Sequence, residues 1–377
     1  MVKEDFNVTP WDVKGEIDYD KLVKEFGLNP LKHLPSVFDR ELVFRRGLVF
    51  AHRDFARIIE AIEEKKKFVV MTGLMPTGKF HIGHMTLVKQ LIFYQGLGAK
   101  VYIAVADIEA YNARGQSLEE SRKIAIEDYI TNYIALGLKK ENCEIYFQSA
   151  RSEDARRANA YYRLQNLLAR HGTFNEFKAV YGEISPGKMV SALLQASDML
   201  HPQLPEFDGS KGKGVPVLVP VGADQDPHLR LARGIARRLK MHDFVPLSST
   251  AHTFIPGLKG GKMSASDETS YIALTDTPKE AEKKIKKYAF SGGRDTLEEH
   301  RKLGGNPDVD VSFQYLKFLF EEDDRKLAKI EADYRYGKML TSELKNIVIT
   351  KINKFLGEHQ KRRDKLKGHV EKFLLKA

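Results

Sequence analysis

The sequence lacks the features that place a chain outside the cell or in a membrane. It holds one cysteine, Cys143, among 377 residues, which permits neither an internal disulfide nor a cysteine zinc cluster. No run of about 18 uninterrupted apolar residues is present that would span a membrane. The first residues, 1–11, carry acids and no apolar stretch of signal-peptide length. We therefore expect a cytoplasmic protein without structural zinc.

Internal repeats and low-complexity segments are also absent, and the composition is that of a globular protein. Hydrophobic residues make up 42% of the chain and charged residues 30%, which favours neither disorder nor a fibre. At about 150 residues per domain, the length predicts two to three domains. The formal net charge of +10 suits a polyanionic partner such as a nucleic acid or a nucleotide.

From residue 67 onward, strand-like runs alternate with helical stretches. Short apolar runs cover residues 67–71, 101–106 and 144–147, and helical stretches follow the first two at 82–94 and 118–136. The alternation predicts an α/β fold, a doubly wound parallel Rossmann-like sheet with helices on both faces. A further run, residues 215–221, contains two prolines, which favours an edge strand or an irregular start.

Two changes of pattern divide the chain. We predict an N-terminal appendage over residues 1–66, a Rossmann-like catalytic domain with a helical insertion over 67–276, and a helical domain over 277–377. Within the last, residues 351–377 hold nine lysines or arginines against three acids. Such a run is either a solvated helix face or an RNA-binding surface, and the pattern alone leaves both open.

The segment after the first predicted strand carries two histidines. His81 and His84 are three residues apart, so we expect both imidazoles on one side of the first helical turn. Open sheets bind ligands at this position, where free N–H groups and the helix dipole attract phosphate. Gly83 leaves room for a base or a ribose to approach the backbone. We call residues 77–84 the histidine turn. It fits a nucleoside triphosphate; the alternative is a pair of surface histidines that cap a helix.

A second segment suited to phosphate lies about 180 residues downstream, and we call residues 260–267 the lysine loop. Lys262 offers a point charge, and the hydroxyls of Ser264 and Ser266 can donate hydrogen bonds to phosphate oxygens. Taken alone, the loop is equally consistent with an ordinary polar loop. A zinc site at either segment would require further histidine or cysteine partners, and the sequence offers none, so we predict no protein-bound metal.

Together the two segments resemble the signature sequences of the class I aminoacyl-tRNA synthetases. The matching residues are His81-Ile82-Gly83-His84 and Lys262-Met263-Ser264-Ala265-Ser266. Residues 222–225 resemble a segment of the tryptophan and tyrosine subgroup. Residues 289–295 and 304–311, with 9–11 and 17–20 near the start, resemble the tryptophanyl enzymes of archaea and eukaryotes. The similarity covers nearly the whole chain.

The resemblance implies an enzyme that activates tryptophan with ATP and transfers it to the 3′-terminal adenosine of tRNA(Trp). Adenylation chemistry leads us to expect Mg²⁺ on the phosphates of the ATP, with phosphate and water as its ligands. Related enzymes bind the anticodon through the C-terminal helical domain, which favours an RNA-binding role for the basic tail, including Lys361-Arg362-Arg363. The family also implies a homodimer.

Three alternatives remain open. A tyrosyl-tRNA synthetase of the same subgroup is the nearest. A nucleotidyltransferase of the same superfamily that acts without tRNA would leave the helical region after Thr277 unexplained. A catalytically silent RNA-binding relative would have no chemical reason to keep His81, His84 and Lys262.

By resemblance, His81, His84 and Lys262 are the catalytic residues. The further ATP-binding residues implied are Gly73, Thr77, Gly83, Met263, Ser264 and Ser266. Glu109, Gln195 and Gln225 match positions that bind the amine of the amino acid. Tyr111 is expected to form a wall of the same pocket.

The sequence departs from the family at the indole site. Eukaryote-like tryptophanyl enzymes hold the indole nitrogen with a tyrosine before the Thr-Gly turn and a glutamine in the second strand. This chain has Met71 and Ala104 there. Residues 195–200 instead resemble the helix of bacterial enzymes whose aspartate accepts the indole N–H. We therefore hypothesise that Asp198 has this role; a capping or solvated aspartate is the alternative.

Overall fold

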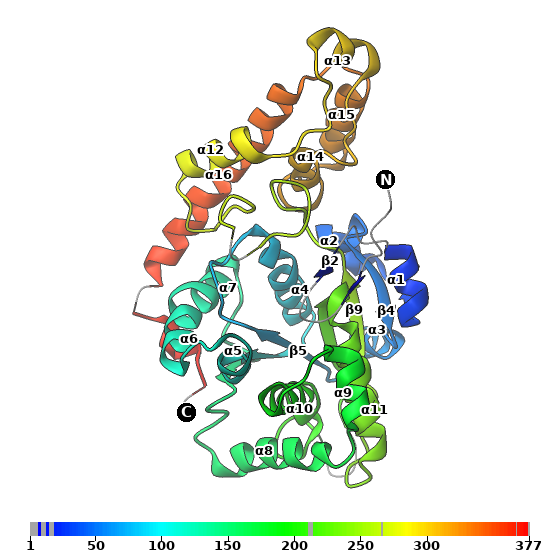
Figure 1. Ribbon diagram of the computed structural model, residues 1–377, viewed down its shortest axis with the longest axis vertical. Helices are drawn as coiled ribbons and strands as arrows, with labels where there is room; N and C mark the ends of the chain where they lie inside the picture. Colours follow the sequence, from blue (N-terminus) through cyan, green and yellow to red (C-terminus); the bar gives the residue numbers. More distant parts are fainter. Residues whose placement is uncertain are drawn as a thin grey trace.

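One mixed sheet organises the molecule. The computed structural model describes residues 7–8, 13–14, 19–209, 214–264, 267–366 and 368–375. Within these, seven strands form the sheet in the order β3-β4-β9-β8-β5-β6-β7 (Figure 1). The five strands from β9 to β7 run parallel. β4 pairs antiparallel with β9, and β3 pairs antiparallel with β4. The strands are β3 (Asn29–Pro30), β4 (Val49–Arg53), β5 (Val69–Leu74), β6 (Lys100–Val105), β7 (Cys143–Phe147), β8 (Val217–Gly222) and β9 (Ser248–His252), and a small separate sheet pairs β1 (Asn7–Val8) with β2 (Val13–Lys14).

Both faces of the parallel strands are buried. On β5, Val70 and Leu74 belong to one hydrophobic core, whereas Val69 and Met71 belong to another on the opposite face. This period of two explains why the strands read as continuous apolar runs. One face is covered by α4 (Met85–Gly96), the π-helix η3 (Ala125–Ile130) and α7 (Thr131–Leu136), and the other by α8 (Ala155–Ala169), α9 (Phe174–Tyr181), α10 (Pro186–Leu200) and α11 (Asp226–Arg238). The predicted doubly wound Rossmann-like class is confirmed.

The segment predicted as an N-terminal appendage is not separate from the sheet. β3 and β4 extend the sheet beyond β9, and Phe38, Phe44 and Phe55 contact the ring of Tyr94 on α4. Residues 29–63 therefore share the core of the parallel strands. The helices here are α1 (Tyr19–Phe26), η1 (Ser36–Arg40), α2 (Leu42–Arg45) and α3 (Ala56–Glu63).

The prolines of residues 215–221 do not mark an edge, because β8 lies inside the sheet between β9 and β5. β8 pairs with β5 only at its first two residues, and the two strands separate beyond Leu218. The carbonyl of Pro216 accepts the N–H of Val69 at 2.9 Å, so by alternation Pro220 also faces β5. Its missing N–H points into the gap. The edge prediction is wrong because the sheet splits internally, at the point where open α/β sheets bind ligands.

The residues after Thr277 form a helical lobe beyond one end of the sheet (Figure 1). Its longest helix, α16, begins within the lobe and ends beside α7. The lobe contains α12 (Pro278–Tyr288), α13 (Leu297–Leu303), α14 (Val311–Tyr315), the π-helix η6 (Leu316–Phe320), α15 (Asp324–Arg335) and α16 (Thr341–Lys365). Of the helices that the structure describes, none combines the length and hydrophobicity that crossing a membrane requires.

The basic tail is partly used inside the molecule. Arg362 donates to the carbonyl of Ala135 at 2.8 Å, and Arg363 lies 3.3 Å from the carboxylate of Asp128. Both partners belong to the helices beneath α16. Lys361 and Arg362 are exposed, and Arg363 is half-buried. An RNA-binding role for Lys361-Arg362-Arg363 stays a prediction. Beyond α16, η7 (Val370–Phe373) leads to Leu374, which pairs with Ile145 of the edge strand β7.

Candidate active site

The histidine turn lies directly beyond β5 and leads into η2 (Ile82–His84) and α4. The two imidazoles lie side by side, with ring centroids 3.8 Å apart, as their spacing predicts. Nδ1 of His81 accepts the N–H of Gly83 at 3.2 Å, and Nδ1 of His84 accepts the N–H of His81 at 3.1 Å. Because each Nδ1 is an acceptor, the proton of each neutral ring sits on Nε2.

Both rings are neutral at physiological pH. Burial lowers the pKa of His84 to about 4, and burial together with the neighbouring His84 lowers the pKa of His81 well below its usual range. The charged imidazolium is disfavoured because it would lose hydration that the site does not replace. The turn therefore offers two Nε2–H donors, besides its backbone N–H groups, rather than two positive charges.

The lysine loop and the residues after it pack against the histidine turn. Ile82 donates its N–H to the carbonyl of Ile272 at 3.0 Å, and Leu274 donates to the carbonyl of Phe80 at 3.0 Å. Lys79 pairs with Glu268 at 2.8 Å. The two segments, remote in sequence, therefore meet at one place. Ala265 and Ser266 of the loop lie outside the described residues.

Gly83 lies where the lysine loop contacts the histidine turn. A Cβ at this position would lie 2.9 Å from Sδ of Met263 and 3.1 Å from the ring of His81. Met263 is itself buried. The small residue allows the lysine loop to contact the histidine turn.

Lys262 extends toward the segment that follows β8. Its Nζ lies 3.1 Å from a carboxylate oxygen of Asp224 in η5 (Ala223–Gln225) and 4.5 Å from the ring centre of Phe254. The lysine side chain is 45% exposed, whereas that of Asp224 is 7% exposed. In the same loop, the backbone N–H of Ser264 donates to Oγ of Ser270 at 3.0 Å. The cation is thus accessible from solvent and paired with a buried acid.

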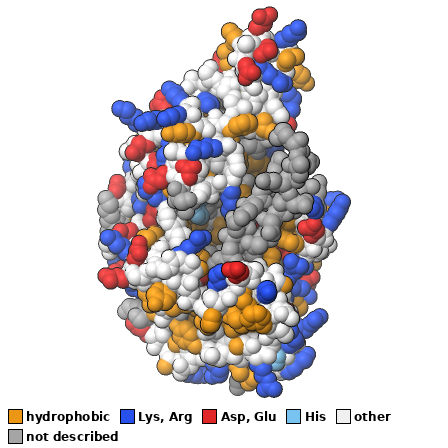
Figure 2. Space-filling view, viewed as in Figure 1, with side chains coloured by type: hydrophobic (Ala, Val, Ile, Leu, Met, Phe, Trp, Pro, Cys, Tyr) orange, Lys and Arg blue, Asp and Glu red, His pale blue; other side chains and the backbone are white. Residues whose placement is uncertain are grey.

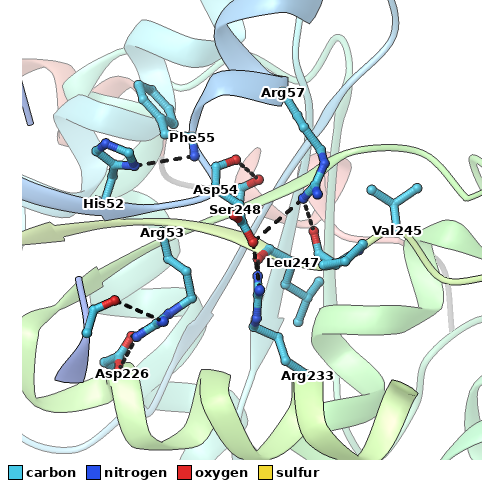
Figure 3. A network of polar contacts seen from close by, with 12 residues as sticks. His52, Arg53, Asp54, Phe55, Arg57, Asp226, Arg233, Val245, Leu247 and Ser248 are labelled. Atoms are coloured by element: carbon cyan, nitrogen blue, oxygen red, sulfur yellow. Dashed lines mark hydrogen bonds and ion pairs between the residues drawn. The ribbon is translucent and has the colours of Figure 1, made fainter. Parts of the chain in front are cut away.

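A polar network anchors the start of α11 to the N-terminal strands (Figure 3). Arg53 of β4 contacts both carboxylate oxygens of Asp226 at 3.0–3.1 Å and the carbonyl of Phe26 at 2.6 Å. On the next turns, Arg233 pairs with Asp54 at 2.6 Å. Asp226 directly follows Gln225, so the N-terminal segment helps to fix this part of the site.

A cavity of about 310 Å³ opens where β5 and β8 separate. Its apolar walls include Met71, Leu87, Met199 and Leu229, and Gly73 and Pro220 border it from the two strands. Its polar lining residues are Thr72, Glu109, Arg114, Gln148, Gln195, Asp198, Gln225 and His228. The volume and the mixture of apolar walls with a few polar groups suit a small ligand with one apolar and one charged end.

Glu109 is the buried acid at one side of this cavity. It lies on α5 (Asp107–Arg114) and accepts a hydrogen bond from the side-chain amide of Gln195 on α10. Burial raises the pKa of Glu109 to about 7, and the nearby Asp198 carboxylate adds to the effect. A buried carboxylate of this kind lacks a nearby positive charge, and the ammonium group of a bound ligand would supply one.

Asp198 lies on α10, like Gln195, and is 4% exposed. One of its oxygens accepts the hydroxyls of Tyr146 and Tyr161, each at 2.6 Å, and the other accepts the amide of Gln148 at 2.8 Å. Burial raises its pKa to about 6. With about four lone-pair positions on a carboxylate, one remains for a ligand donor. The alternative of a solvated or helix-capping aspartate is excluded.

Four of the five residues that the sequence predicted to bind the amino acid line the cavity, and one lies outside it. Glu109, Gln195, Asp198 and Gln225 all line it. Tyr111 does not form a wall: its side chain is 57% exposed, because it stands two residues after Glu109 on one helix and points away. Of the two family departures, Met71 lines the cavity, whereas Ala104 is fully buried beside Gly73, its partner on β6, and does not line the cavity.

Three of the polar residues that line the cavity were not predicted from the sequence. Gln148 directly follows β7, so the rule that parallel sheets bind ligands at strand ends could have found it. His228 lies one helical turn after Gln225 and its Nδ1 is 2.5 Å from the hydroxyl of Tyr181; burial lowers its pKa to about 3. Arg114 gives no sequence signal.

Comparisons with known proteins agree with this arrangement. The family model for tRNA synthetases class I (W and Y) matches residues 63–357. The tryptophan–tRNA ligase of Aeropyrum pernix is 43% identical over 364 residues, 95% of each chain, and that of Methanocaldococcus jannaschii is 40% identical over 374 residues, 97% of this chain and 98% of the relative. The crystal structure of the tryptophanyl-tRNA synthetase from Aeropyrum pernix K1 matches with a TM-score of 0.88 at 42% identity, covering 95% of this chain and 96% of the other.

Proposed function

Since this chain belongs to the class I tRNA synthetases for tryptophan and tyrosine, we propose how its residues divide the work of a tryptophan–tRNA ligase. The activity is that ligation: tryptophan is activated with ATP and transferred to tRNA(Trp), as in relatives that match over nearly their whole length. The tyrosyl alternative is not favoured. The contact between the histidine turn and the lysine loop, beside a cavity suited to an amino acid, is the observation that supports the proposal most.

ATP binds where the two segments meet. In adenylation the carboxylate of tryptophan attacks the α-phosphate and pyrophosphate leaves, so negative charge grows on the phosphates. The Nε2–H donors of His81 and His84 point to this charge from the start of η2, and Lys262 leaves Asp224 to meet the pyrophosphate. Gly73, Thr77, Met263, Ser264 and Ser266 complete the proposed site.

Mg²⁺ accompanies ATP in this proposal. The described residues contain no group of three histidine, cysteine, aspartate or glutamate side chains placed to hold a metal. We propose phosphate oxygens and water as the ligands of the ion. When bound, Mg²⁺ would neutralise part of the negative charge on the phosphates.

Tryptophan occupies the cavity between β5 and β8. Glu109, Gln195 and Gln225 receive the ammonium group, and Met71, Leu87 and Met199 pack against the ring. Asp198 accepts the indole N–H with its remaining lone pair, taking the place of the tyrosine and glutamine that this chain lacks. An indole N–H buried without a partner costs about 1–3 kcal/mol, so this carboxylate selects the substrate.

We expect tryptophan to bind more weakly as the pH falls below about 7. Because the pKa of Glu109 is raised to about 7, the acid gains a proton in this range and its charge no longer stabilises the ammonium of the ligand. Calorimetric dissociation constants between about pH 5.5 and 8.5 test this. Glu109→Gln removes the group that titrates near pH 7 and should flatten the profile between about pH 6.5 and 8.5, whereas the weakening below about pH 6 that follows protonation of Asp198 should persist. A wild-type dissociation constant that stays level across the range would contradict the role of Glu109.

The remaining proposals concern the tRNA, the domains and the assembly. We propose residues 67–276, together with residues 29–63 that share their sheet and core, as the catalytic domain, and 277–377 as the anticodon-binding domain. On the face shown in Figure 2, basic and acidic side chains are interspersed over the molecule, so the basic surplus is not collected there. We also propose a cytoplasmic location and a homodimer. The exposed apolar side chains of Tyr111, Leu118 and Val190, which lie on neighbouring helices, support the homodimer.

The two half-reactions test the function directly. We expect ATP–pyrophosphate exchange with tryptophan, much weaker exchange with tyrosine, and labelled tryptophanyl-tRNA as the product. Preferred exchange with tyrosine would overturn the substrate. Exchange without a charged tRNA product would leave a nucleotidyltransferase, and absence of exchange would leave an RNA-binding protein.

A further inference from the structure

The π-helix η3 forms two hydrogen bonds with the backbone of the histidine turn on its buried side. Asp128 accepts the backbone N–H of Phe80 at 2.6 Å, and the hydroxyl of Tyr129 donates to the carbonyl of Thr77 at 2.7 Å. These two bonds fix both ends of the short stretch that precedes His81. A π-helix, with hydrogen bonds between residues i and i+5, is rare and occurs frequently at functional sites.

The position of Phe80 determines the position of His84. The two rings stack with centroids 4.9 Å apart and planes 28° apart, and Phe80 also meets the edges of Tyr129 and Tyr133. Phe80 is fully buried, so it cannot shift without moving these neighbours. The hydrogen bond from the N–H of Phe80 to Asp128 therefore also helps to hold the imidazole of His84, which stacks on Phe80.

Asp128 is in turn held by the helical lobe. Arg363, near the end of α16, lies 3.3 Å from one oxygen of Asp128, and the same oxygen accepts the amide of Asn132 at 2.8 Å. Arg363 also donates to the carbonyl of Glu127 at 3.1 Å. Burial raises the pKa of Asp128, whereas the Phe80 N–H and Arg363 oppose that rise. The arginine thus favours the ionised carboxylate, which makes the stronger acceptor for Phe80.

α16 spans the distance between the lobe and this contact (Figure 1). Its 25 residues correspond to about 37 Å of continuous helix. At its other end, Thr341 contacts the hydroxyl groups of Ser291 and Tyr334 within the lobe, at 3.2 and 3.1 Å. A displacement of the lobe is therefore carried along one helix to Arg363.

We propose that Asp128 is a positioning residue for the histidine turn, and that Arg363 couples it to the helical lobe, so that the seating of α16 tunes the binding of ATP. The inference rests on the proposed function, because it assumes that the histidine turn binds the phosphates. Neither residue lines the tryptophan cavity. Disturbing the pair should therefore affect ATP and leave tryptophan binding as it is.

The test is tryptophan-dependent pyrophosphate exchange, without tRNA, for Arg363→Ala. We expect KM for ATP to rise about 5- to 10-fold, within the usual range for coupled sites, while KM for tryptophan changes less than about twofold. Arg363→Lys keeps the charge and should restore part of the loss. Asp128→Asn should act in the same direction as Arg363→Ala, and the double variant should add little to either single variant because both break one connection.

Arg362→Ala is the matched control. Arg362 anchors the same turn of α16 through the carbonyl of Ala135 and does not touch Asp128. We expect its KM for ATP to match the unmodified chain, with thermal unfolding midpoints showing that all variants fold. Equal rises in KM for ATP for both arginine variants would reduce Arg363 to a docking contact. An unchanged KM for ATP in exchange, with a raised KM for tRNA in a separate aminoacylation assay, would make Arg363 an RNA contact. Either result overturns the proposal. Absence of exchange in the unmodified chain would instead refute the proposed function.

Discussion

Lys262→Ala is expected to lower kcat of tryptophan-dependent pyrophosphate exchange about 100- to 1,000-fold and to leave KM for tryptophan within about twofold. The reason is the place and time at which charge develops. Pyrophosphate gains negative charge as it leaves, and Lys262 is the cation that the lysine loop brings beside the histidine turn. In the structure it reaches toward Asp224, outside the cavity proposed for tryptophan.

Lys259→Ala is the control for this experiment. Lys259 precedes Lys262 by three residues and forms an ion pair with Asp267 at 2.8 Å, so its removal also deletes a cation from this region. We expect kcat to stay within about twofold, because an exposed pair contributes little and does not face the histidine turn. Similar losses for both lysines, or a loss confined to KM for tryptophan, would contradict the assigned role of Lys262.

Asp198→Asn is expected to raise KM for tryptophan about 5- to 150-fold, which corresponds to about 1–3 kcal/mol for a buried donor left without its acceptor. Asparagine is nearly the same size and keeps one oxygen for the hydroxyls of Tyr146 and Tyr161. Its amide nitrogen then replaces the oxygen that faces Gln148 and cannot accept the indole N–H. Exchange kinetics with varied tryptophan, and separately with varied ATP, measure the effect.

Asp107→Asn provides the comparison at similar burial. Asp107 is 1% exposed, accepts the backbone N–H of Ser149 at 3.1 Å, and lies outside the cavity lining. We expect this variant to lose stability while KM for tryptophan stays within about twofold. If Asp198→Asn unfolds at a lower temperature but binds tryptophan unchanged, the carboxylate is structural and another group must hold the indole.

The meeting of the two signature segments was predicted from the family resemblance, whereas the suitability of each segment for phosphate could be predicted from its own residues. His81 and His84 face one way by helical spacing, and Lys262 sits between glycines and serines in a loop suited to phosphate. The parallel strands were also readable, since β5 and β6 are apolar on both faces. The roles of Glu109 and Gln195 in binding the amino acid were predicted from the family resemblance. In the structure their side chains are hydrogen-bonded to each other.

Features that depend on long-range pairing could not be predicted. Whether β4 joins β9 is decided by packing of residues about 200 positions apart. The split beyond Leu218, which makes Pro220 acceptable inside a sheet, has no local signal. The outward direction of Tyr111 follows from the orientation of α5. The internal use of Arg363 depends on where α16 ends relative to Asp128, so a count of basic residues could not separate it from Lys361.

A crystal structure of the chain with ATP and tryptophanamide gives the most direct measurement of the central claim. Tryptophanamide lacks the attacking carboxylate, so ATP stays intact. We predict one ATP whose phosphates lie within hydrogen-bonding distance of Nε2 of His81 or His84 and of Nζ of Lys262, with the indole N–H on Asp198. An ATP bound to only one of the two segments, with the other facing a separate cavity, would contradict the account.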